Sequence, residues 1–183
     1  MTISTSHDRA FGVTEVELTP EEMRRAAYIG CDRQCWALAA GAKHLNHRER
    51  QANPLDEWTQ NIHAAGAELA LAKWMGIPWE PPDGPGDADV GPYEVRWTKY
   101  DHGHLQLQPK DVEAKGDRLY YLVTGLGPRY TLRGWILGAQ ANNAKKYWRN
   151  PNQNAKANDP RYCFYIPQSD LYPVDPIGTE THQ

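Results

Sequence analysis

Three acidic residues, Asp87, Asp89 and Glu94, fall within eight residues, and Glu94 opens an alternating run that ends at Trp97. Clustered carboxylates repel one another unless a cation joins them, and their hard oxygen atoms suit Mg²⁺ or Mn²⁺. A bound ion of this kind activates water and offsets the negative charge of a phosphodiester in its transition state. Arg96, two residues after Glu94, is a permanent cation that can stabilise the same charge. The stretch therefore predicts a metal site suited to phosphodiester hydrolysis.

A structural explanation of the same stretch stays open. From Ile77 to Val95 the chain has no lysine or arginine, and its acids stand among prolines and glycines, as in a solvated loop. A Glu-x-Arg pair on one strand face is often a surface ion pair that contributes only ~0–1 kcal/mol. Asp87 and Asp89 also remain alternatives as the partner of Glu94, because they differ in their distance from the strand.

The elements that would position these side chains follow from periodicity. Strand alternation places Glu94 and Arg96 on one face of a strand, and Val95 and Trp97 on the other. Further alternating or apolar runs predict strands at 104–108, 118–125, 130–138 and 161–167.

Two long helices precede these strands. Thr19 is placed to cap the first helix, with Pro20 in its first turn and Glu22 completing a capping box, and Gly41 is a plausible stop. The second helix spans 54–76, carries apolar residues every three to four positions and places Glu68 among small residues. A third helix is predicted for 138–148.

An aspartate, a short gap and a Glu-x-Lys strand, preceded by a glutamate on a helix, form the signature of the PD-(D/E)xK nucleases, the restriction-endonuclease-like superfamily. The chain resembles this pattern from about residue 55 to 166. The superfamily core is a helix, a three-strand meander, a helix and a strand. The resemblance implies an α/β (α+β) fold with a mixed sheet of about four to five strands flanked by helices.

The resemblance also implies site residues and a cofactor. Asp89, or failing that Asp87, corresponds to the motif aspartate, and Glu94 corresponds to the glutamate of Glu-x-Lys. These two acids would bind Mg²⁺ (or Mn²⁺), and Glu68 would complete the catalytic site. Arg96 stands where the family has lysine, and since arginine keeps its proton it could stabilise a phosphate but not act as a base. The gap between Asp89 and Glu94 is short for the superfamily.

The chain is also similar to a group of small uncharacterised phage and prophage proteins. They share the DVG…VR stretch, a GWI-G joint and a late Y-IPQ-L segment, and this similarity implies no activity. We expect residues 1–17 to form a loose leader, 18–172 a single α/β domain and 173–183 a tail.

A basic and aromatic segment supports a nucleic-acid partner. Between Gly138 and Cys163 there are five cations and one acid, with aromatic residues interleaved. Cations bind phosphates and aromatic rings stack on bases, so the segment predicts contacts to DNA or RNA. A lysine-rich helix end that merely keeps the protein soluble is the alternative. The predicted nucleic-acid-binding residues are Lys145, Lys146, Trp148 and Arg149.

Composition narrows the class of protein. The net charge of −3 argues against a uniformly basic coat, and no apolar run reaches the ~18 residues of a membrane span. An odd number of cysteines and the absence of a secretory h-region favour the cytoplasm. Zinc binding by Cys31 and Cys35 with His44 and His47 is disfavoured because no pair has C-x₂-C spacing.

The sequence thus predicts a Mg²⁺-dependent DNA nuclease, expected to be phage- or prophage-encoded. The alternative is a non-catalytic accessory factor on the same scaffold that binds nucleic acid or protein, and a structural or host-interaction protein is a third class. His102 and His104 are interpreted as a polar hairpin turn and not as a histidine–metal site. A homo-oligomer is compatible with the sequence, which does not fix the oligomeric state.

Overall fold

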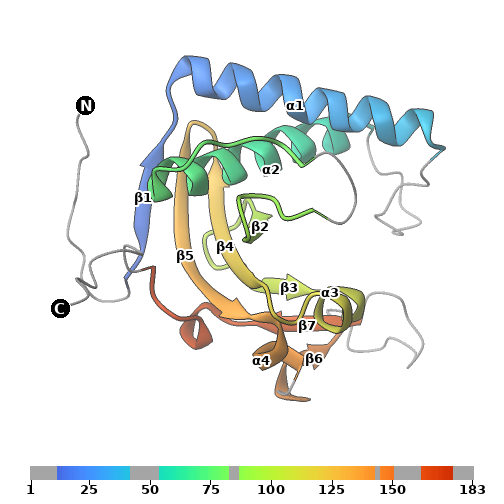
Figure 1. The fold of residues 1–183 in the computed structure, drawn as a ribbon, viewed down its shortest axis with the longest axis vertical. Helices are drawn as coiled ribbons and strands as arrows, with labels where there is room; N and C mark the ends of the chain where they lie inside the picture. The colour runs from blue at the N-terminus through green and yellow to red at the C-terminus, as the bar shows by residue number, and fades with distance from the viewer. Residues whose placement is uncertain (1–11, 42–53, 83–86, 143–144, 151–161, 175–183) are drawn as a thin grey trace.

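Two long helices and two β-sheets form an α+β fold (Figure 1). The structure is a computed structural model, and it describes residues 12–41, 54–82, 87–142, 145–150 and 162–174. Among the helices in these ranges, none combines the length and hydropathy that crossing a membrane requires.

Helix α1 (Pro20–Ala39) begins as the sequence predicts. The Glu22 N–H donates to the Thr19 hydroxyl at 3.2 Å, and the Thr19 N–H donates to the Glu22 carboxylate at 2.6 Å. This reciprocal capping box satisfies two N–H groups that the first helical turn leaves without partners.

Helix α2 (Pro54–Met75) packs along α1 and covers the larger sheet (Figure 1). A Cβ added at Gly30 of α1 would lie 2.5 Å from the Ile62 Cα, so the missing side chain is what lets the two backbones approach. Gly76, with φ +68°, follows the last helical residue and ends α2 as predicted.

The larger sheet has the strand order β1-β5-β4-β2 and is mixed. Strands β4 (Leu119–Leu126) and β5 (Arg129–Leu137) form an antiparallel hairpin, and β1 (Thr14–Glu17) pairs antiparallel with β5. Strand β2 (Glu94–Thr98) runs parallel to β4 and is an edge strand. The connection from β2 to β4 passes through α3 (Pro109–Ala114).

A second, antiparallel sheet has the order β3-β7-β6, formed by β3 (Leu105–Leu107), β7 (Cys163–Ile166) and β6 (Trp148–Arg149). The short helices α4 (Gly138–Asn142), η1 (Lys145–Tyr147) and η2 (Gln168–Asp170) complete this half of the molecule.

Strand β4 separates two hydrophobic cores because successive side chains point to opposite faces. Tyr121 and Val123 face α2, whereas Tyr120 and Leu122 face the second sheet and α3. Burial on both faces explains the continuous apolar run of this strand.

Three sequence predictions need correction. The predicted leader includes β1, so Thr14–Glu17 are not loose; residues 1–11 lie outside the described ranges. The predicted helix 138–148 is wrong, since α4 ends at Asn142 and Trp148 lies on a strand. In the predicted tail, Val174 is buried and its N–H donates to the Gly12 carbonyl.

The sequence predicted one mixed sheet of about four to five strands, whereas the structure has a mixed four-strand sheet that includes the unpredicted β1 and a separate three-strand sheet. Strand β3 lies close to its predicted position, yet it pairs with β7 and not with the strands of the larger sheet. Helix α3 was also missed, because it is only six residues long and shows no apolar period.

Candidate functional site

Charged side chains from α1, α2, α3 and the segments around β2 and β4 meet at the β2 edge of the larger sheet. We call this group the edge cluster. It consists of Arg33, Glu68, Asp89, Glu94, Arg96, Asp111, Lys115 and Arg118.

A tight turn brings Asp89 to the strand. Val90 and Tyr93 form an isolated bridge with N–O distances of 3.0 and 2.9 Å, and Gly91 between them has φ +54°. A positive φ of this kind suits glycine, which lacks a Cβ. Asp89 faces β2, where its carboxylate accepts from the Val95 N–H, whereas the Asp87 side chain is exposed.

Side chains of the cluster cover the polar edge of β2. The Val95 N–H donates to Asp89 Oδ2 at 2.8 Å, and the Val95 carbonyl accepts from Arg96 Nη1 at 3.0 Å. An uncovered edge would expose backbone donors and acceptors to pairing with another strand. Asp89 and Arg96 therefore have a structural role whatever else they do.

Glu94 is 3 % exposed and meets three cations. Its Oε1 lies 3.0 Å from Lys115 Nζ and 2.5 Å from an Arg118 nitrogen, and its Oε2 lies 3.4 Å from Arg96 Nη1. Burial alone would raise the pKa of Glu94, but hydrogen bonds from Lys115 and Arg118 and the charge of Arg96 lower it below the ordinary value. Glu94 is thus a stable carboxylate.

Arg96 is shared among three acids. Its Nη1 lies 3.4 Å from Glu94 and 3.7 Å from Asp89, while its Nη2 lies 3.2 Å from Asp111 Oδ2. The guanidinium also lies 5.2 Å from the centre of the Tyr120 ring. Burial would lower the pKa of Arg96, but these acids raise it, so its charge is permanent.

Glu68 is 4 % exposed and receives two hydrogen bonds from Arg33, at 2.6 and 2.7 Å. Burial, with a contribution from the charge of Asp89, raises the pKa of Glu68 to about 7, and Arg33 only partly offsets this. Burial also raises the pKa of Asp89, and the charge of Glu94 adds to the shift. Glu68 therefore titrates close to neutral pH.

The predicted site residues do not all converge on one point. In the register of β2 with β4, Glu94 lies opposite Tyr120 and Arg96 lies opposite Leu122, so both charged side chains are on the face that α3 covers. Strand alternation predicted that these two side chains share a face. Glu68 comes from α2, which covers the opposite face. Asp89 lies at the strand edge, in contact with Arg96, and its charge acts on Glu68. The structure thus brings Asp89, Glu94 and Arg96 together and leaves Glu68 at the far side of the cluster.

We next ask whether the acids of the edge cluster are arranged to bind a divalent cation. Within the described residues, no group of three or more His, Cys, Asp or Glu side chains is arranged to hold a metal. Asp89 and Glu94 remain as a pair that faces one cationic nitrogen of Arg96. Proteins often hold Mg²⁺ with one or two carboxylates, water and substrate phosphate, so this pair could contribute to such a site only after the guanidinium leaves.

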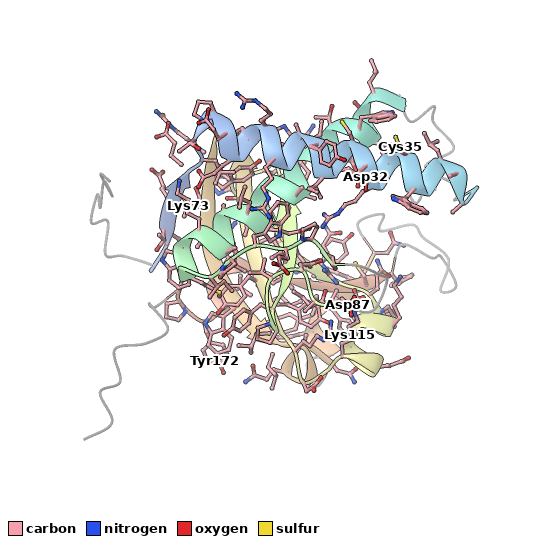
Figure 2. The ribbon with its side chains drawn as sticks, turned by 45° about the horizontal axis from the view of Figure 1, so that its top comes forward. Asp32, Cys35, Lys73, Asp87, Lys115 and Tyr172 are labelled. Carbon is pink, nitrogen blue, oxygen red and sulfur yellow. The ribbon has the colours of Figure 1, made fainter. Side chains whose placement is uncertain are left out.

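Four members of the edge cluster were missed by sequence reasoning: Arg33, Asp111, Lys115 and Arg118. Asp111 had a usable signal, since Pro109 in the first turn and an acid two residues later are typical of a helix start. Lys115, labelled in Figure 2, follows the last turn of α3, and no local pattern ties it to Glu94.

The predicted nucleic-acid-binding residues lie on and beside the second sheet. Lys146 Nζ lies 2.8 Å from Asp170, and hydrogen bonds from Lys146 and Tyr147 lower the pKa of Asp170 to about 2. Trp148 is 42 % exposed, and Arg149 is exposed and donates to the Tyr165 carbonyl at 3.2 Å. The Lys145 side chain lies outside the described part of the structure. We call Lys146, Trp148 and Arg149 the second-sheet flank.

The remaining sequence candidates lie away from the edge cluster. Cys31 and Cys35, the latter labelled on α1 in Figure 2, are free thiols, and His44 and His47 lie outside the described ranges. His102 and His104 lie in the turn between β2 and β3, where the Gly103 N–H donates to the Tyr100 carbonyl at 2.8 Å.

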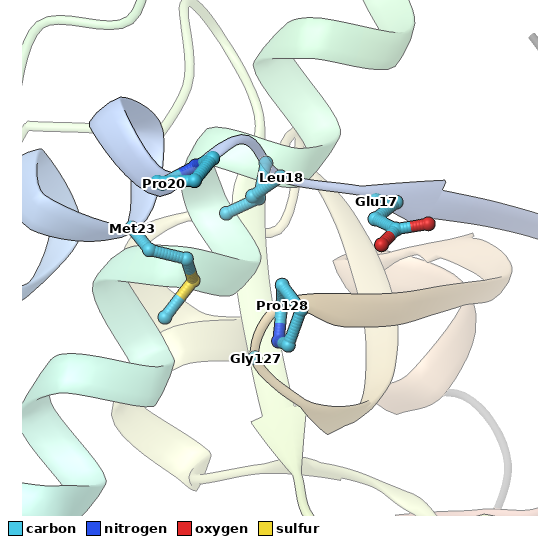
Figure 3. A pocket seen from close by; sticks show the side chains of 6 residues that line it. All are labelled: Glu17, Leu18, Pro20, Met23, Gly127 and Pro128. Carbon is cyan, nitrogen blue, oxygen red and sulfur yellow. The ribbon is translucent and has the colours of Figure 1, made fainter. Parts of the chain in front are cut away.

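A hollow of about 330 Å³ lies between the start of α1 and the β4–β5 turn (Figure 3). Its lining is mostly apolar and consists of Glu17, Leu18, Pro20, Met23, Gly127 and Pro128. It contains no member of the edge cluster.

Comparison with known proteins gives no match: no protein-family model, no curated protein and no solved structure matches this chain.

Proposed function

We propose that this protein is a Mg²⁺-dependent (or Mn²⁺-dependent) DNA nuclease of the PD-(D/E)xK type that hydrolyses phosphodiesters. One observation carries the proposal: Asp89, in the turn before the edge strand β2, and Glu94, its first residue, both face a single cation position that Arg96 Nη1 now takes. Proteins commonly bind Mg²⁺ with one or two carboxylates, together with water and substrate phosphate.

The order of elements supports a restriction-endonuclease-like core. Helix α2 with Glu68 is followed by the Asp89 turn, the Glu94–Arg96 strand, α3 and then β4, which runs parallel to β2. The helix, the motif strand, the crossover helix and the parallel strand occur in the superfamily's order. The three-strand meander is less well matched, because only the Val90–Tyr93 bridge precedes β2 and β3 joins the second sheet.

Each residue has a role that its environment allows. Asp89 and Glu94 would hold the ion, which when bound would activate water and offset phosphate charge. Arg96 would bind a nonbridging phosphate oxygen, because its permanent charge suits phosphate but not proton transfer. Glu68 lies at the far side of the cluster and is bonded to Arg33, so with a pKa of about 7 it could adjust the charge of the cluster near neutral pH, but it is not placed to transfer a proton beside Asp89 and Glu94.

Lys115 and Arg118 extend the predicted set. Both approach Glu94 Oε1, and about a quarter of each side chain is exposed (26 % in both). Cations that solvent can reach beside a metal-binding carboxylate are suitably placed to attract a phosphodiester. We propose the cytoplasm of the host cell as the place of action and a phage or prophage as the source.

The second candidate is a metal-independent accessory factor that binds nucleic acid or protein. It is favoured by the position of Arg96, which already neutralises Asp89 and Glu94. In that case the acids and cations of the cluster neutralise one another, and the cluster has only a structural role. Any DNA binding would then be independent of Mg²⁺.

The deciding experiment combines calorimetric Mn²⁺ titration with plasmid cleavage for wild type, Glu94→Gln and Glu113→Gln. Glu113 is an exposed acid on α3 and serves as the matched control. We expect Glu94→Gln to lose Mn²⁺ binding and cleavage together while Glu113→Gln keeps both, with thermal unfolding showing that all three are folded. DNA binding that is unaffected by Mg²⁺ and EDTA, without cleavage, would identify the accessory factor. A protein that binds neither ion nor DNA would belong to the structural or host-interaction class.

A further inference from the structure

We propose that Arg96 is a built-in competitor for the metal, held between two acidic contacts, and that its displacement couples metal binding to substrate binding. The inference rests on the proposed function, because it concerns regulation of the same site. Three distances support it, which join the Arg96 guanidinium to Glu94, Asp89 and Asp111.

The first contact lies on the metal side. Arg96 Nη1 lies 3.4 Å from Glu94 Oε2 and 3.7 Å from Asp89 Oδ2, so a cation already stands between the two carboxylates. An ion at roughly 2.0–2.6 Å from both carboxylates could not share this space with the guanidinium. Metal entry therefore requires Nη1 to leave.

The second contact lies on the helix side and would retain the displaced arginine. Arg96 Nη2 lies 3.2 Å from Asp111 Oδ2. Asp111 is itself fixed, because its Oδ2 accepts from the Gln108 N–H at 3.0 Å and its carbonyl accepts from the Tyr120 hydroxyl at 2.8 Å. The Tyr120 ring also lies beside the guanidinium. Arg96 can thus release Asp89 and Glu94 without losing every partner.

The charge of the cluster explains the coupling. Four acids (Glu68, Asp89, Glu94 and Asp111) stand against four cations (Arg33, Arg96, Lys115 and Arg118), so the formal sum with all groups ionised is zero. A divalent ion beside Glu94 Oε2 raises this sum by two and frees Arg96, while Lys115 and Arg118 remain paired with Glu94 Oε1. The cluster then attracts a phosphodiester more strongly, and linkage makes the effect reciprocal.

The test uses two substitutions with opposite expected signs. Arg96→Ala removes the competitor, so calorimetry should give a Kd for Mn²⁺ about fivefold lower or more. Asp111→Asn keeps an acceptor for the Gln108 N–H but weakens the second contact. Arg96 should then stay on Asp89 and Glu94, and the Kd for Mn²⁺ should rise.

Control substitutions of the same residue types are available outside the edge cluster. Arg129→Ala removes an arginine that is 78 % exposed and pairs only at 3.7 Å with Glu17, and Asp117→Asn removes an exposed acid close to α3. Both should leave the Kd for Mn²⁺ unchanged. In parallel, the Kd of a labelled DNA duplex is measured with and without Ca²⁺, and wild type should bind at least about fivefold more tightly with the ion.

The outcomes separate this inference from the proposed function. If Arg96→Ala binds Mn²⁺ no more tightly than wild type, the competitor role is overturned while the metal site stands. An unchanged Kd in Asp111→Asn overturns the retaining role of Asp111. Duplex affinity that ignores Ca²⁺ overturns the coupling. If wild type binds no Mn²⁺ but Arg96→Ala does, the competitor is supported and Mg²⁺-dependent catalysis by the natural protein is overturned. If neither binds Mn²⁺, both proposals fail.

Discussion

The edge cluster and the second-sheet flank carry similar residue types but are constructed differently. In the edge cluster, cations from α1, β2 and the end of α3 meet buried or half-buried acids, most of them from other elements, as with Arg33 and Glu68. In the flank, Lys146 pairs with Asp170, and the Lys146 side chain is 66 % exposed. An ion pair in the edge cluster therefore contributes more to stability than one in the flank, because burial strengthens electrostatic interactions and reduces screening by solvent and salt.

This difference indicates in which of the two regions functional residues are expected, namely the one with buried charged groups. Buried acids that keep their charge or titrate near neutrality must be held by specific partners, and such perturbed groups gather at functional sites. An exposed lysine beside an acid is easily replaced by solvent. Substitutions in the edge cluster should therefore affect stability and function strongly, and those in the flank only weakly.

The largest effect is expected from Arg33→Met at pH 8. Without Arg33, a carboxylate that is 4 % exposed loses the partner at 2.6 Å, and stranding a buried charge costs about 3–5 kcal/mol. Urea unfolding measures the loss. Arg24→Met, which changes an arginine that is 76 % exposed on the same helix, should stay within about 0.5 kcal/mol of wild type.

The Arg33→Met loss should depend on pH with a definite sign. Burial raises the pKa of Glu68 to about 7 from an ordinary 4.5, so between these values the folded state binds the extra proton. The contribution of Glu68 to stability is thus present below pH 4.5 and is lost as pH rises through 7. In Arg33→Met the pKa should rise further, so the loss should be clearly smaller at pH 5.5 than at pH 8. An equal loss at both pH values would show that Arg33 acts by packing alone.

The next effect concerns the packing that places Arg33 over Glu68. Gly30 lies one turn before Arg33, and a Cβ there would meet the Ile62 backbone at 2.5 Å. Backbone atoms cannot rotate away, so Gly30→Ala should cost about 1–3 kcal/mol despite the higher helix propensity of alanine. Tyr28→Ala, on the exposed face of α1, is the control with little expected loss. A Gly30→Ala protein as stable as wild type would show that the helices separate easily.

The sequence predicted the parts of the fold that rest on local signals. The capping box at Thr19 and the stop at Gly76 define α1 and α2, and the period of two places Glu94 and Arg96 on one face. Strand β1 was missed because four residues with one buried side chain show no clear pattern. Its pairing with β5 is made by residues more than a hundred positions away.

The candidate site could be predicted only in part for the same physical reason. Asp89, Glu94 and Arg96 lie within eight residues, so their proximity follows from a turn and a strand. Other charged partners in the cluster come from farther along the chain: Lys115 is 21 residues from Glu94, and Arg33 is 35 residues from Glu68. No local pattern records these long-range contacts. Glu68 lies on the predicted helix, but the face of the sheet that it lies on depended on packing.

The smallest effect is expected at the flank, and it decides whether the flank touches DNA at all. Lys146 already pairs with Asp170 at 2.8 Å, so Lys146→Ala should change the slope of log K against log salt by well under 0.9, the value for one full phosphate contact. Arg149 is exposed and pairs only with a carbonyl in the described contacts, so Arg149→Ala should flatten the slope by about 0.9. Asp170→Asn, which releases Lys146, should steepen it. Lys146→Ala and Arg149→Ala each remove one exposed charge, whereas the Asp170 side chain is 27 % exposed and also accepts from the Tyr147 hydroxyl, so thermal unfolding is measured to show that all three variants are folded. Identical slopes for wild type and all three variants would show that the flank is only solvated, and that any DNA contact belongs to the edge cluster.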